Sequence, residues 1–263
     1  MARTAIVSAM AEELRGLQQH LAQPVCVVHG GREFWTGKLA GAPVVLALSR
    51  IGKVAAATTV ATLLCSFDDV SRLVFTGAAG GLGDGVRVGD IVVADALLQH
   101  DMDASPLFPR FEVPLYGRCR FVVDGSMAAA VGAAAEAMLE AVCSGGSCQA
   151  GGLSRTHLDE FGLARPRVHR GLIVSGDRFV SSAAECAALR VALPDALAVE
   201  MEGAAVAQVC ADFGVPLAVV RTISDRADES AHVDFLRFIV DVASRYTVAV
   251  ALGLLGAGLG PPS

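Results

Sequence analysis

Short runs rich in β-branched residues alternate with longer, alanine-rich segments along the chain, and this alternation limits the folds it can adopt. The runs predict strands over residues 4–7, 25–28, 34–39, 44–48, 73–75, 90–94, 168–174, 197–200 and 216–223. The alanine-rich segments predict helices over 11–21, 54–65, 126–142, 183–193, 203–213 and 234–255. Buried strands separated by helices are typical of α/β domains. We therefore expect an α/β fold with a central mixed β-sheet flanked by helices.

The chain shows no internal repeat and no shift in composition that would mark a domain boundary. We therefore expect a single domain over residues 1–263. The weakest segment is 144–166, where glycines and scattered charges replace a periodic pattern. A flexible insertion is one interpretation of this segment, because strand signals resume directly after it.

The composition points to a large buried core and a small-molecule partner. Hydrophobic residues make up 53% of the chain and charged residues 18%, against typical values of about 45–50% and about 25%. A disordered chain is excluded by this balance. The 21 Lys and Arg residues are outnumbered by 27 Asp and Glu, which gives a formal net charge of −6 without any basic run. This is not the electrostatic pattern of a nucleic-acid-binding protein.

The cysteines and the two chain ends bear on location. Seven cysteines are present, an odd number, and no two have the C-x-x-C spacing. We expect free thiols in a reducing compartment, and neither disulfides nor a zinc site. The N-terminus lacks the apolar segment of a signal peptide. The apolar run 247–259 is shorter than the ~20 residues of a membrane span, and glycines interrupt it. These features predict a cytoplasmic protein without a membrane segment, a metal or a cofactor.

Acidic residues stand at the ends of three predicted strands, where α/β sheets usually place their ligands. Each has an ordinary explanation as a first-turn acid or a helix cap. Carboxylates that emerge together at one sheet edge suit general acid/base chemistry on a polar substrate, but spacing alone does not show that they converge. The residues are Glu12, Glu13, Glu200, Glu202 and Asp225.

A glycine-rich segment, 76–83, follows the predicted strand 73–75. Glycine lets a backbone approach a ligand closely. The segment matches neither G-x-x-x-x-G-K-[ST] nor a G-x-G-x-x-G that opens a helix, so nucleoside triphosphates and dinucleotides lose support. Taken alone, it is interpreted as a tight turn.

Several longer stretches carry a family resemblance. They are SAMAEEL (8–14), SRIGKVAAA (49–57), FTGAAGGL (75–82), VRVGDIVVAD (86–95), GLIVSGDRFV (171–180), AVEMEGAAVAQVC (198–210) and VVRTISDRAD (219–228). Each stretch is modest alone, but the set covers nearly the whole chain in one order and is specific. With it, the chain resembles the 5′-methylthioadenosine/S-adenosylhomocysteine nucleosidases, within the purine nucleoside phosphorylase superfamily.

The resemblance implies that water cleaves the N-glycosidic bond of an adenine thionucleoside, releasing adenine and a ribosylthio product. In the family, an aspartate after the last core strand protonates N7 of adenine. Asp225 stands at that position, and Ser224 is expected to orient it. A glutamate of the first strand–helix loop activates the attacking water, and Glu13 aligns with it. The neighbouring Glu12 is expected to be a helix-start acid.

The resemblance also implies a sugar-binding group. Glu202 would bind the ribose hydroxyls, Met201 would pack on the sugar, and Glu200 and Arg221 would be supporting polar groups. Departure of the base leaves oxocarbenium character on the ribose, which nearby carboxylates stabilise.

For the base, the resemblance implies an apolar pocket. Phe179 would stack on adenine, and the backbone of Val180 would read its edge. Ile51 and Phe235 would line the wall near the sugar and its 5′ substituent. The family often carries a hydroxyl residue where this chain has Ala78, so one contact to the water or the sugar is expected to be missing.

A second subunit caps the 5′ end of the substrate in this family, so the resemblance implies a homodimer. The segment 102–115, rich in proline and phenylalanine, would lie near the interface. His100 opens this cap and His232 follows Asp225, which makes both candidate neighbours of the ligand.

Three alternative functions stay open on these residues. A phosphorylase would replace water with phosphate, but a carboxylate at Glu13 repels phosphate. Other N-ribosyl hydrolases, such as those acting on futalosine-type nucleosides, would use Asp225 as well. The charges of Arg50 and Arg178 beside pocket motifs fit such a change of substrate, although surface positions are the favoured explanation for them. A non-catalytic nucleoside-binding protein is disfavoured, because Glu13, Glu202 and Asp225 occupy the matching positions together.

Overall fold

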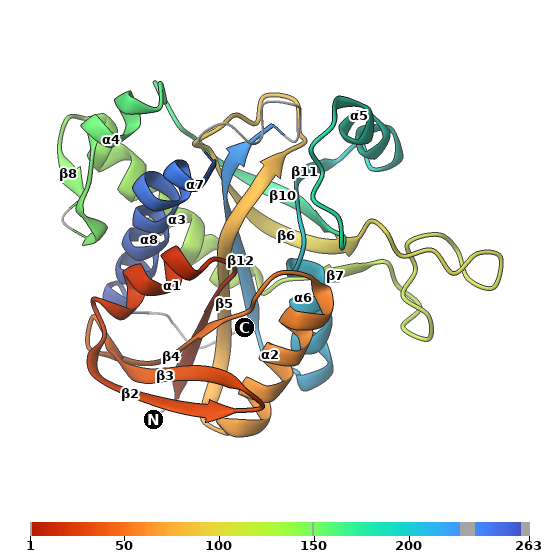
Figure 1. The fold of residues 1–263 in the computed structure, drawn as a ribbon, viewed down its shortest axis with the longest axis horizontal. Coiled ribbons are helices and arrows are strands. Elements are labelled where there is room, and N and C mark those ends of the chain that lie inside the picture. Colours follow the sequence, from red (N-terminus) through yellow and green to blue (C-terminus); the bar gives the residue numbers. More distant parts are fainter. Residues whose placement is uncertain (1, 149, 227–234, 259–263) are drawn as a thin grey trace.

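The computed structural model describes residues 2–148, 150–226 and 235–258, and within them a single mixed β-sheet forms the centre of the molecule (Figure 1). The strands follow the order β11-β10-β6-β12-β5-β1-β4-β3-β2, and β7 pairs with β6. Their bounds are β1 Arg3–Ser8, β2 Ala22–His29, β3 Arg32–Leu39, β4 Ala42–Leu48, β5 Val70–Gly81, β6 Ile91–Gln99, β7 Arg120–Val122, β10 Val168–Ser175, β11 Ala196–Glu200 and β12 Leu217–Asp225. The predicted α/β class is confirmed.

Strand β12, which ends in the candidate residue Asp225, lies at the centre of this sheet between β6 and β5. β1 and β12 both run parallel to β5, and β10 runs parallel to β6 and β11. β12 is antiparallel to β6, which makes the sheet mixed. The carboxyl ends of β1, β5 and β12 therefore open at one edge of the sheet, the usual place for a ligand in α/β folds.

Strand β5 extends further than the sequence predicts. The glycine-rich segment continues the strand to Gly81 and pairs with both β12 and β11. The prediction of a tight turn is wrong, because neighbouring strands offer backbone partners along this whole segment. Glycine provides space here instead: a Cβ on Gly77 would lie 2.9 Å from Nη1 of Arg221.

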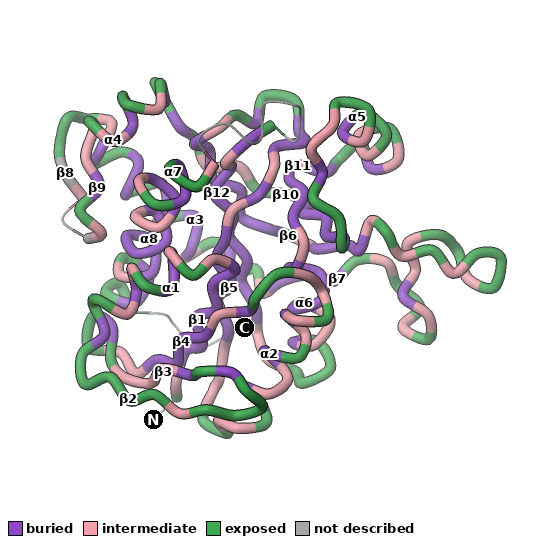
Figure 2. The backbone as a smooth tube through the Cα atoms, viewed as in Figure 1, coloured by how far each residue is buried: buried purple, intermediate pink, exposed green. Residues whose placement is uncertain are grey.

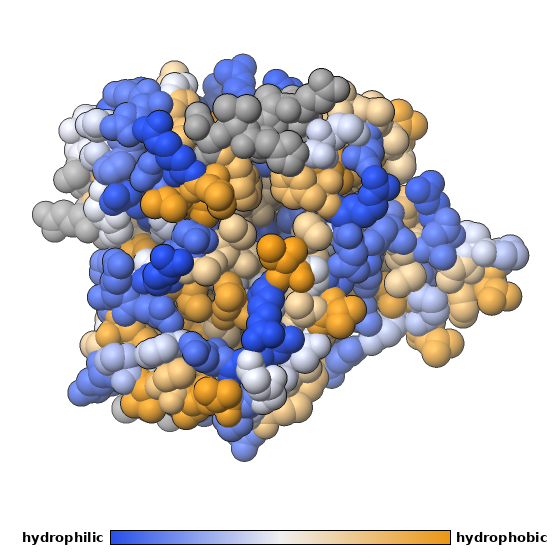
Figure 3. Space-filling model, viewed as in Figure 1, coloured by the Kyte–Doolittle hydropathy of each residue, from blue (hydrophilic) through white to orange (hydrophobic). Residues whose placement is uncertain are grey.

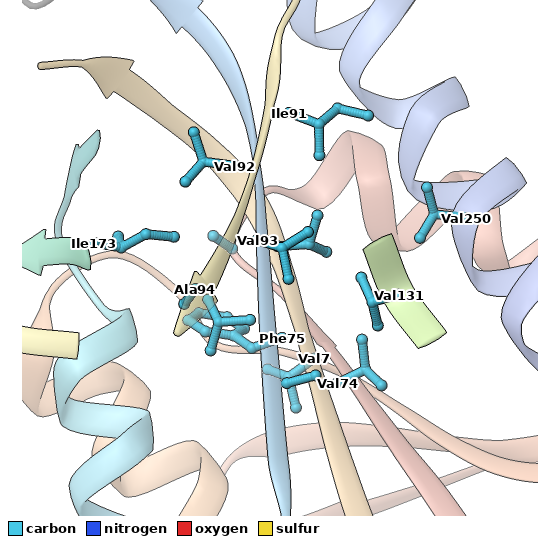
Figure 4. Packing of buried hydrophobic residues seen from close by; sticks show 14 of the residues in the cluster. Val7, Val74, Phe75, Ile91, Val92, Val93, Ala94, Val131, Ile173 and Val250 are labelled. Atoms are coloured by element: carbon cyan, nitrogen blue, oxygen red, sulfur yellow. The ribbon is translucent and has the colours of Figure 1, made fainter. Parts of the chain in front are cut away.

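Helices cover both faces of the sheet (Figure 1). On one face α8 packs against α1 and α3, and on the other α2 packs against α6. The buried core where helices and sheet meet includes Val7, Val74, Phe75, Val131 and Val250 (Figure 4). The helix bounds are α1 Ala11–Gln18, α2 Lys53–Ser66, α3 Gly125–Cys143, α5 Ala183–Ala192, α6 Gly203–Phe213 and α8 Ser244–Gly256.

The C-terminal helix contains an interruption that the sequence does not predict. Its first predicted residue, Asp234, lies outside the described residues. After it come α7 Phe235–Phe238, the π-helical turn η2 Ile239–Ala243 and then α8. A π turn accommodates an additional residue and so rotates every side chain that follows. Ile239, Val242 and Ala243 in this turn are buried. Their apolar spacing in the sequence is therefore the same as that of an ordinary α-helix, and it does not reveal the π turn.

The segment 144–166 forms short elements of its own: β8 Ser147–Cys148, η1 Ala150–Gly152, β9 Leu153–Ser154 and α4 Arg155–Glu160. Leu153, Leu158 and Leu163 from this segment are buried in the main core.

Among the described residues, two helices are long and apolar enough, by length and composition, to cross a membrane: α3 and the run Phe235–Gly256. In this fold both supply core side chains, and α3 and α8 pack on each other and on the sheet. Burial in the core accounts for their apolar composition without a membrane.

Candidate active site

A cavity of about 180 Å³ lies at the carboxyl ends of β5, β11 and β12. On the face of the molecule that Figure 3 shows, apolar side chains gather around a central recess. Ten of the residues that sequence analysis singled out line it: Ile51, Ala78, Phe179, Val180, Glu200, Met201, Glu202, Ser224, Asp225 and Phe235. Of the five acidic residues named from the sequence, Glu200, Glu202 and Asp225 therefore converge on this cavity.

Two predicted site residues, Glu13 and Arg221, are fully buried beside the cavity and do not line it. Six further lining residues lie within the matched motifs, and of these only Arg178 was named from the sequence, as a charge beside the pocket. Most are small or apolar and carry no chemical signal of their own. They are Ala9, Met10, Ala79, Gly80, Arg178 and Val199.

Asp225 ends strand β12 and is 6% exposed. The register of β12 against β5 shifts between Ile223 and Asp225, and such irregularities re-aim side chains next to active sites. Ser224 Oγ donates a hydrogen bond of 2.8 Å to Oδ2 of Asp225. The expectation that Ser224 orients this carboxyl is consistent with that contact.

Glu200 and Arg221 form a buried ion pair, with 2.7 Å between Nη2 and Oε2. Glu200 also accepts hydrogen bonds from the Ser175 hydroxyl and from the backbone N–H of Gly203. The Arg221 guanidinium stacks over the ring of Phe75, with Cζ 4.1 Å from the ring centroid. A charge pair with this many partners is fixed in place. It puts the positive charge of Arg221, which Glu200 neutralises, next to the cavity.

Glu202 precedes α6 and is nearly buried. Its Oε1 accepts a 2.8 Å hydrogen bond from the backbone N–H of Gly52, which has a φ of +94° that favours glycine. Burial and the negative charge of Glu200 raise the pKa of Glu202 to about 7, against the opposing effect of Arg221.

Glu13 lies in the first turn of α1 and has no exposed surface. Its Oε2 accepts a hydrogen bond of 3.3 Å from the backbone N–H of Met10, and its Oε1 accepts one of 3.1 Å from the Thr247 hydroxyl. Burial raises the pKa of Glu13 to about 7, although the Arg221 charge and both hydrogen bonds oppose the rise. A base with a pKa near neutrality is well matched to proton transfer at physiological pH.

The neighbouring Glu12 is partly exposed and pairs with Arg15 at 3.4 Å. Its place on the outer side of α1 agrees with the expectation of a helix-start acid.

Aromatic rings form one wall of the cavity. Phe179 and Phe235 meet edge to face, with 6.3 Å between ring centroids and an interplanar angle of 82°. Phe179 keeps 45% of its surface exposed, which leaves area for a stacked base. Phe179 follows β10 and Phe235 precedes η2, so the two rings are 56 positions apart in the sequence.

The other charges named from the sequence have partners away from the cavity floor. Arg178 pairs with Glu185, and Arg50 donates to the Gly31 carbonyl at 2.8 Å. His100 lies against Gly176 and does not line the cavity. His232 falls outside the described residues.

Across the described ranges, no three His, Cys, Asp or Glu side chains gather closely enough to hold a metal ion.

The sequence model of the phosphorylase superfamily matches residues 3–255. The chain is similar to the 5′-methylthioadenosine/S-adenosylhomocysteine nucleosidase from Neisseria meningitidis solved with methylthio-immucillin-A, at 32% identity and a TM-score of 0.79, covering 98% of this chain and 100% of that chain. The corresponding nucleosidase from S. pneumoniae, solved with the transition-state inhibitor MT-ImmA, is 34% identical with a TM-score of 0.79, and the match covers 97% of this chain and 99% of that chain. A futalosine hydrolase mutant of Helicobacter pylori strain 26695 is 28% identical with a TM-score of 0.78, with 98% and 100% covered.

Proposed function

Because the chain belongs to the phosphorylase superfamily and, within it, to the 5′-methylthioadenosine/S-adenosylhomocysteine nucleosidases, we propose that its cavity hydrolyses the N-glycosidic bond of adenine thionucleosides. The substrates are 5′-methylthioadenosine and S-adenosylhomocysteine, and the products are adenine and a ribosylthio sugar. The observation that carries the proposal is that Glu202 and Asp225 line one largely apolar cavity, while Glu13 is buried beside it and bonded to Met10 of the cavity wall. No cofactor enters the reaction.

At the base end, Asp225 acts as the general acid. Adenine stacks on Phe179, and the backbone of Val180 reads its edge. Asp225 then donates a proton to N7 of adenine, and the hydrogen bond from Ser224 fixes which oxygen carries it. Protonation makes adenine a better leaving group, because the C1′–N9 electron pair departs onto a neutral base.

At the sugar end, carboxylates stabilise the positive charge that develops on the ribose as the bond breaks. Glu202 holds the ribose hydroxyls against Met201, with Ile51 and Phe235 on the 5′ side. Glu13 takes a proton from the water that attacks C1′. Burial raises the pKa of both Glu13 and Glu202, and the buried charge of Arg221, which is paired with Glu200, lowers it and so favours their ionised forms.

The charges around the cavity favour water over phosphate as the nucleophile. Arg221 is buried and paired with Glu200, and Arg178 at the cavity wall is paired with Glu185. Glu13 and Glu202 remain beside and at the cavity, and in their ionised forms they repel a phosphate dianion. Hydrolysis therefore fits the described residues better than phosphorolysis.

The proposal is tested by measuring base release from methylthioadenosine, S-adenosylhomocysteine, adenosine and inosine, with and without phosphate. We expect adenine release from the two thionucleosides at a rate that phosphate does not change. Strict dependence on phosphate would make the protein a phosphorylase. A futalosine-type nucleoside belongs in the same panel, and preferential cleavage of it would assign the chain to that activity instead.

We further infer a homodimer in which the segment 102–115 reaches the partner. This segment belongs to an arm that extends away from the body and is largely exposed (Figure 2). Leu107 and Leu115 on it are 84% and 93% exposed, and exposed apolar side chains of this size commonly mark an interface. Ile51 at the cavity and Val54 on α2 are exposed as well and offer a matching apolar surface.

Sedimentation velocity tests the dimer. The expected mass is about twice the 27.0 kDa of one chain. Leu107→Asp is expected to shift it toward a single chain, because a charge on this side chain opposes burial. A wild-type mass of one chain at all concentrations contradicts the inference.

We infer that the protein acts in the cytoplasm, in nucleoside catabolism and methionine salvage. The odd number of cysteines, seven, and the lack of any C-x-x-C spacing support a reducing compartment.

A further inference from the structure

One hydroxyl far along the chain contacts the carboxyl that we propose as the base. Within the described residues, Thr247 is the side chain that donates a hydrogen bond to Glu13, at 3.1 Å from Oγ1 to Oε1. Thr247 is 5% exposed and Glu13 is fully buried, so the contact is made away from bulk water. Nothing in the sequence marks this threonine, which follows Ser244, Arg245 and Tyr246 at the start of α8 and precedes an apolar run.

The path of the C-terminal helix explains how Thr247 reaches Glu13. The helix begins at Phe235, which lines the cavity, and passes through the π turn Ile239–Ala243 before α8. An additional residue in that turn rotates the following side chains by about 100° relative to an unbroken α-helix. With that rotation Thr247, rather than a neighbouring residue, faces α1. Turns of this kind occur frequently at functional sites.

The two oxygens of Glu13 are held differently. Oε1 accepts from the Thr247 hydroxyl, whereas Oε2 accepts a longer contact of 3.3 Å from the Met10 backbone N–H. Met10 lines the cavity, so Oε2 is the oxygen bonded to a residue of the cavity wall. A carboxylate anchored through one oxygen keeps a defined orientation for the other.

We propose that Thr247 is a positioning residue for hydrolysis: its hydroxyl holds Oε1 of Glu13, so that Oε2 receives the proton of the attacking water. The inference rests on the proposed function. In the step itself, the water oxygen bonds to C1′, the C1′–N9 pair leaves with adenine, and the water proton moves to Oε2.

Few other charges act on Glu13, so the effect of Thr247 can be isolated. Arg221 from β12 and Glu12 from α1 are the charged groups that influence it. On the C-terminal helix, Arg245 is bound to the carbonyls of Gly151 and Gly152, and Asp241 is paired with Arg237.

The test compares Thr247→Val, which loses the hydroxyl but keeps the shape, with Thr247→Ser, which keeps the hydroxyl. The hydrogen bond stabilises the ionised carboxylate, so its loss raises the pKa of Glu13. The acid limb of the kcat–pH profile is expected to move up by about one pH unit in Thr247→Val. At a pH below the wild-type midpoint this is a loss of about tenfold, most of which alkaline pH restores. Thr247→Ser is expected to keep the wild-type midpoint.

A matched control is Thr59→Val, which removes a buried hydroxyl of α2. This hydroxyl donates to the backbone carbonyl of Ala55 in the same helix and to that of Ser49, which precedes the helix. It is expected to lower the melting temperature without moving the midpoint. Thr247→Ala provides a second deletion of the hydroxyl if the valine variant does not fold.

The outcomes distinguish failure of the positioning role of Thr247 from failure of the proposed hydrolysis. A wild-type enzyme that releases no adenine contradicts the proposed function. An active wild type with an unmoved acid limb in folded Thr247→Val or Thr247→Ala overturns the positioning role alone, and so does an equal loss of rate at every pH.

Discussion

Replacing Asp225 by asparagine is expected to lower kcat for adenine release by about 10²- to 10⁴-fold, the usual contribution of a general acid. The substitution removes the transferable proton but preserves the shape of the side chain. Ser224 Oγ, 2.8 Å from Oδ2 in the wild type, can still donate to the asparagine oxygen. Substrate binding should therefore persist, and the defect should appear in kcat rather than in KM.

The measurement is a single-turnover assay with methylthioadenosine, together with equilibrium binding of the intact nucleoside. Ser224→Ala is the graded control: it leaves the acid in place and loses its orienting hydrogen bond, so a smaller fall in rate is expected. An Asp225→Asn enzyme with a rate near that of the wild type would assign protonation of adenine to another group.

Replacing Glu13 by glutamine is expected to lower kcat over a similar range and, at the same time, to stabilise the folded protein at alkaline pH. The first effect follows from loss of the base that takes the water proton. The second follows from burial: the pKa of Glu13 lies at about 7 in the folded state, against 4.5 for the ordinary value. A carboxyl with a raised pKa favours folding when protonated, and this contribution disappears as pH rises from 4.5 through about 7.

Glutamine cannot ionise, so the variant avoids the cost of a buried charge. Above pH 7 the expected gain in the free energy of unfolding is up to about 3 kcal/mol, and at pH 4.5 no gain is expected. Urea unfolding of both proteins at pH 4.5 and pH 8 measures the difference. Equal stabilities at pH 8, combined with full activity, would show that Glu13 is neither the base nor a buried ionising group.

The fold was largely predictable from the sequence because its signals are local. Strands such as β1 and β4 are short apolar runs, and α6 was predicted with its observed bounds, Gly203–Phe213. The prediction failed where a neighbour decides the conformation. Residues up to Gly81 extend β5 because β11 and β12 lie alongside to pair with them, and no local pattern reveals that.

In the candidate site too, the residues in local motifs were predictable, and those whose role depends on distant parts of the chain were not. Asp225 and Glu202 stand at strand ends in recognisable motifs, and the structure brings both to the cavity. Thr247 carries no signal, because its meaning depends on a π turn and on a partner 234 positions earlier. Full burial of Glu13 and Arg221 was likewise not visible, since it results from how α1, β5 and β12 pack together.

The edge-to-face contact between Phe179 and Phe235 has a consequence for inhibitor design and for how substrate specificity can change by mutation. These two rings belong to segments outside the sheet, whereas Asp225 and the Glu200–Arg221 pair are held by the sheet strands β11 and β12. Changes in the aromatic wall can accumulate without disturbing the groups that break the bond. An inhibitor that draws its affinity from the strand-borne charges is therefore harder to evade by mutation than one that depends on the fit of its 5′ tail.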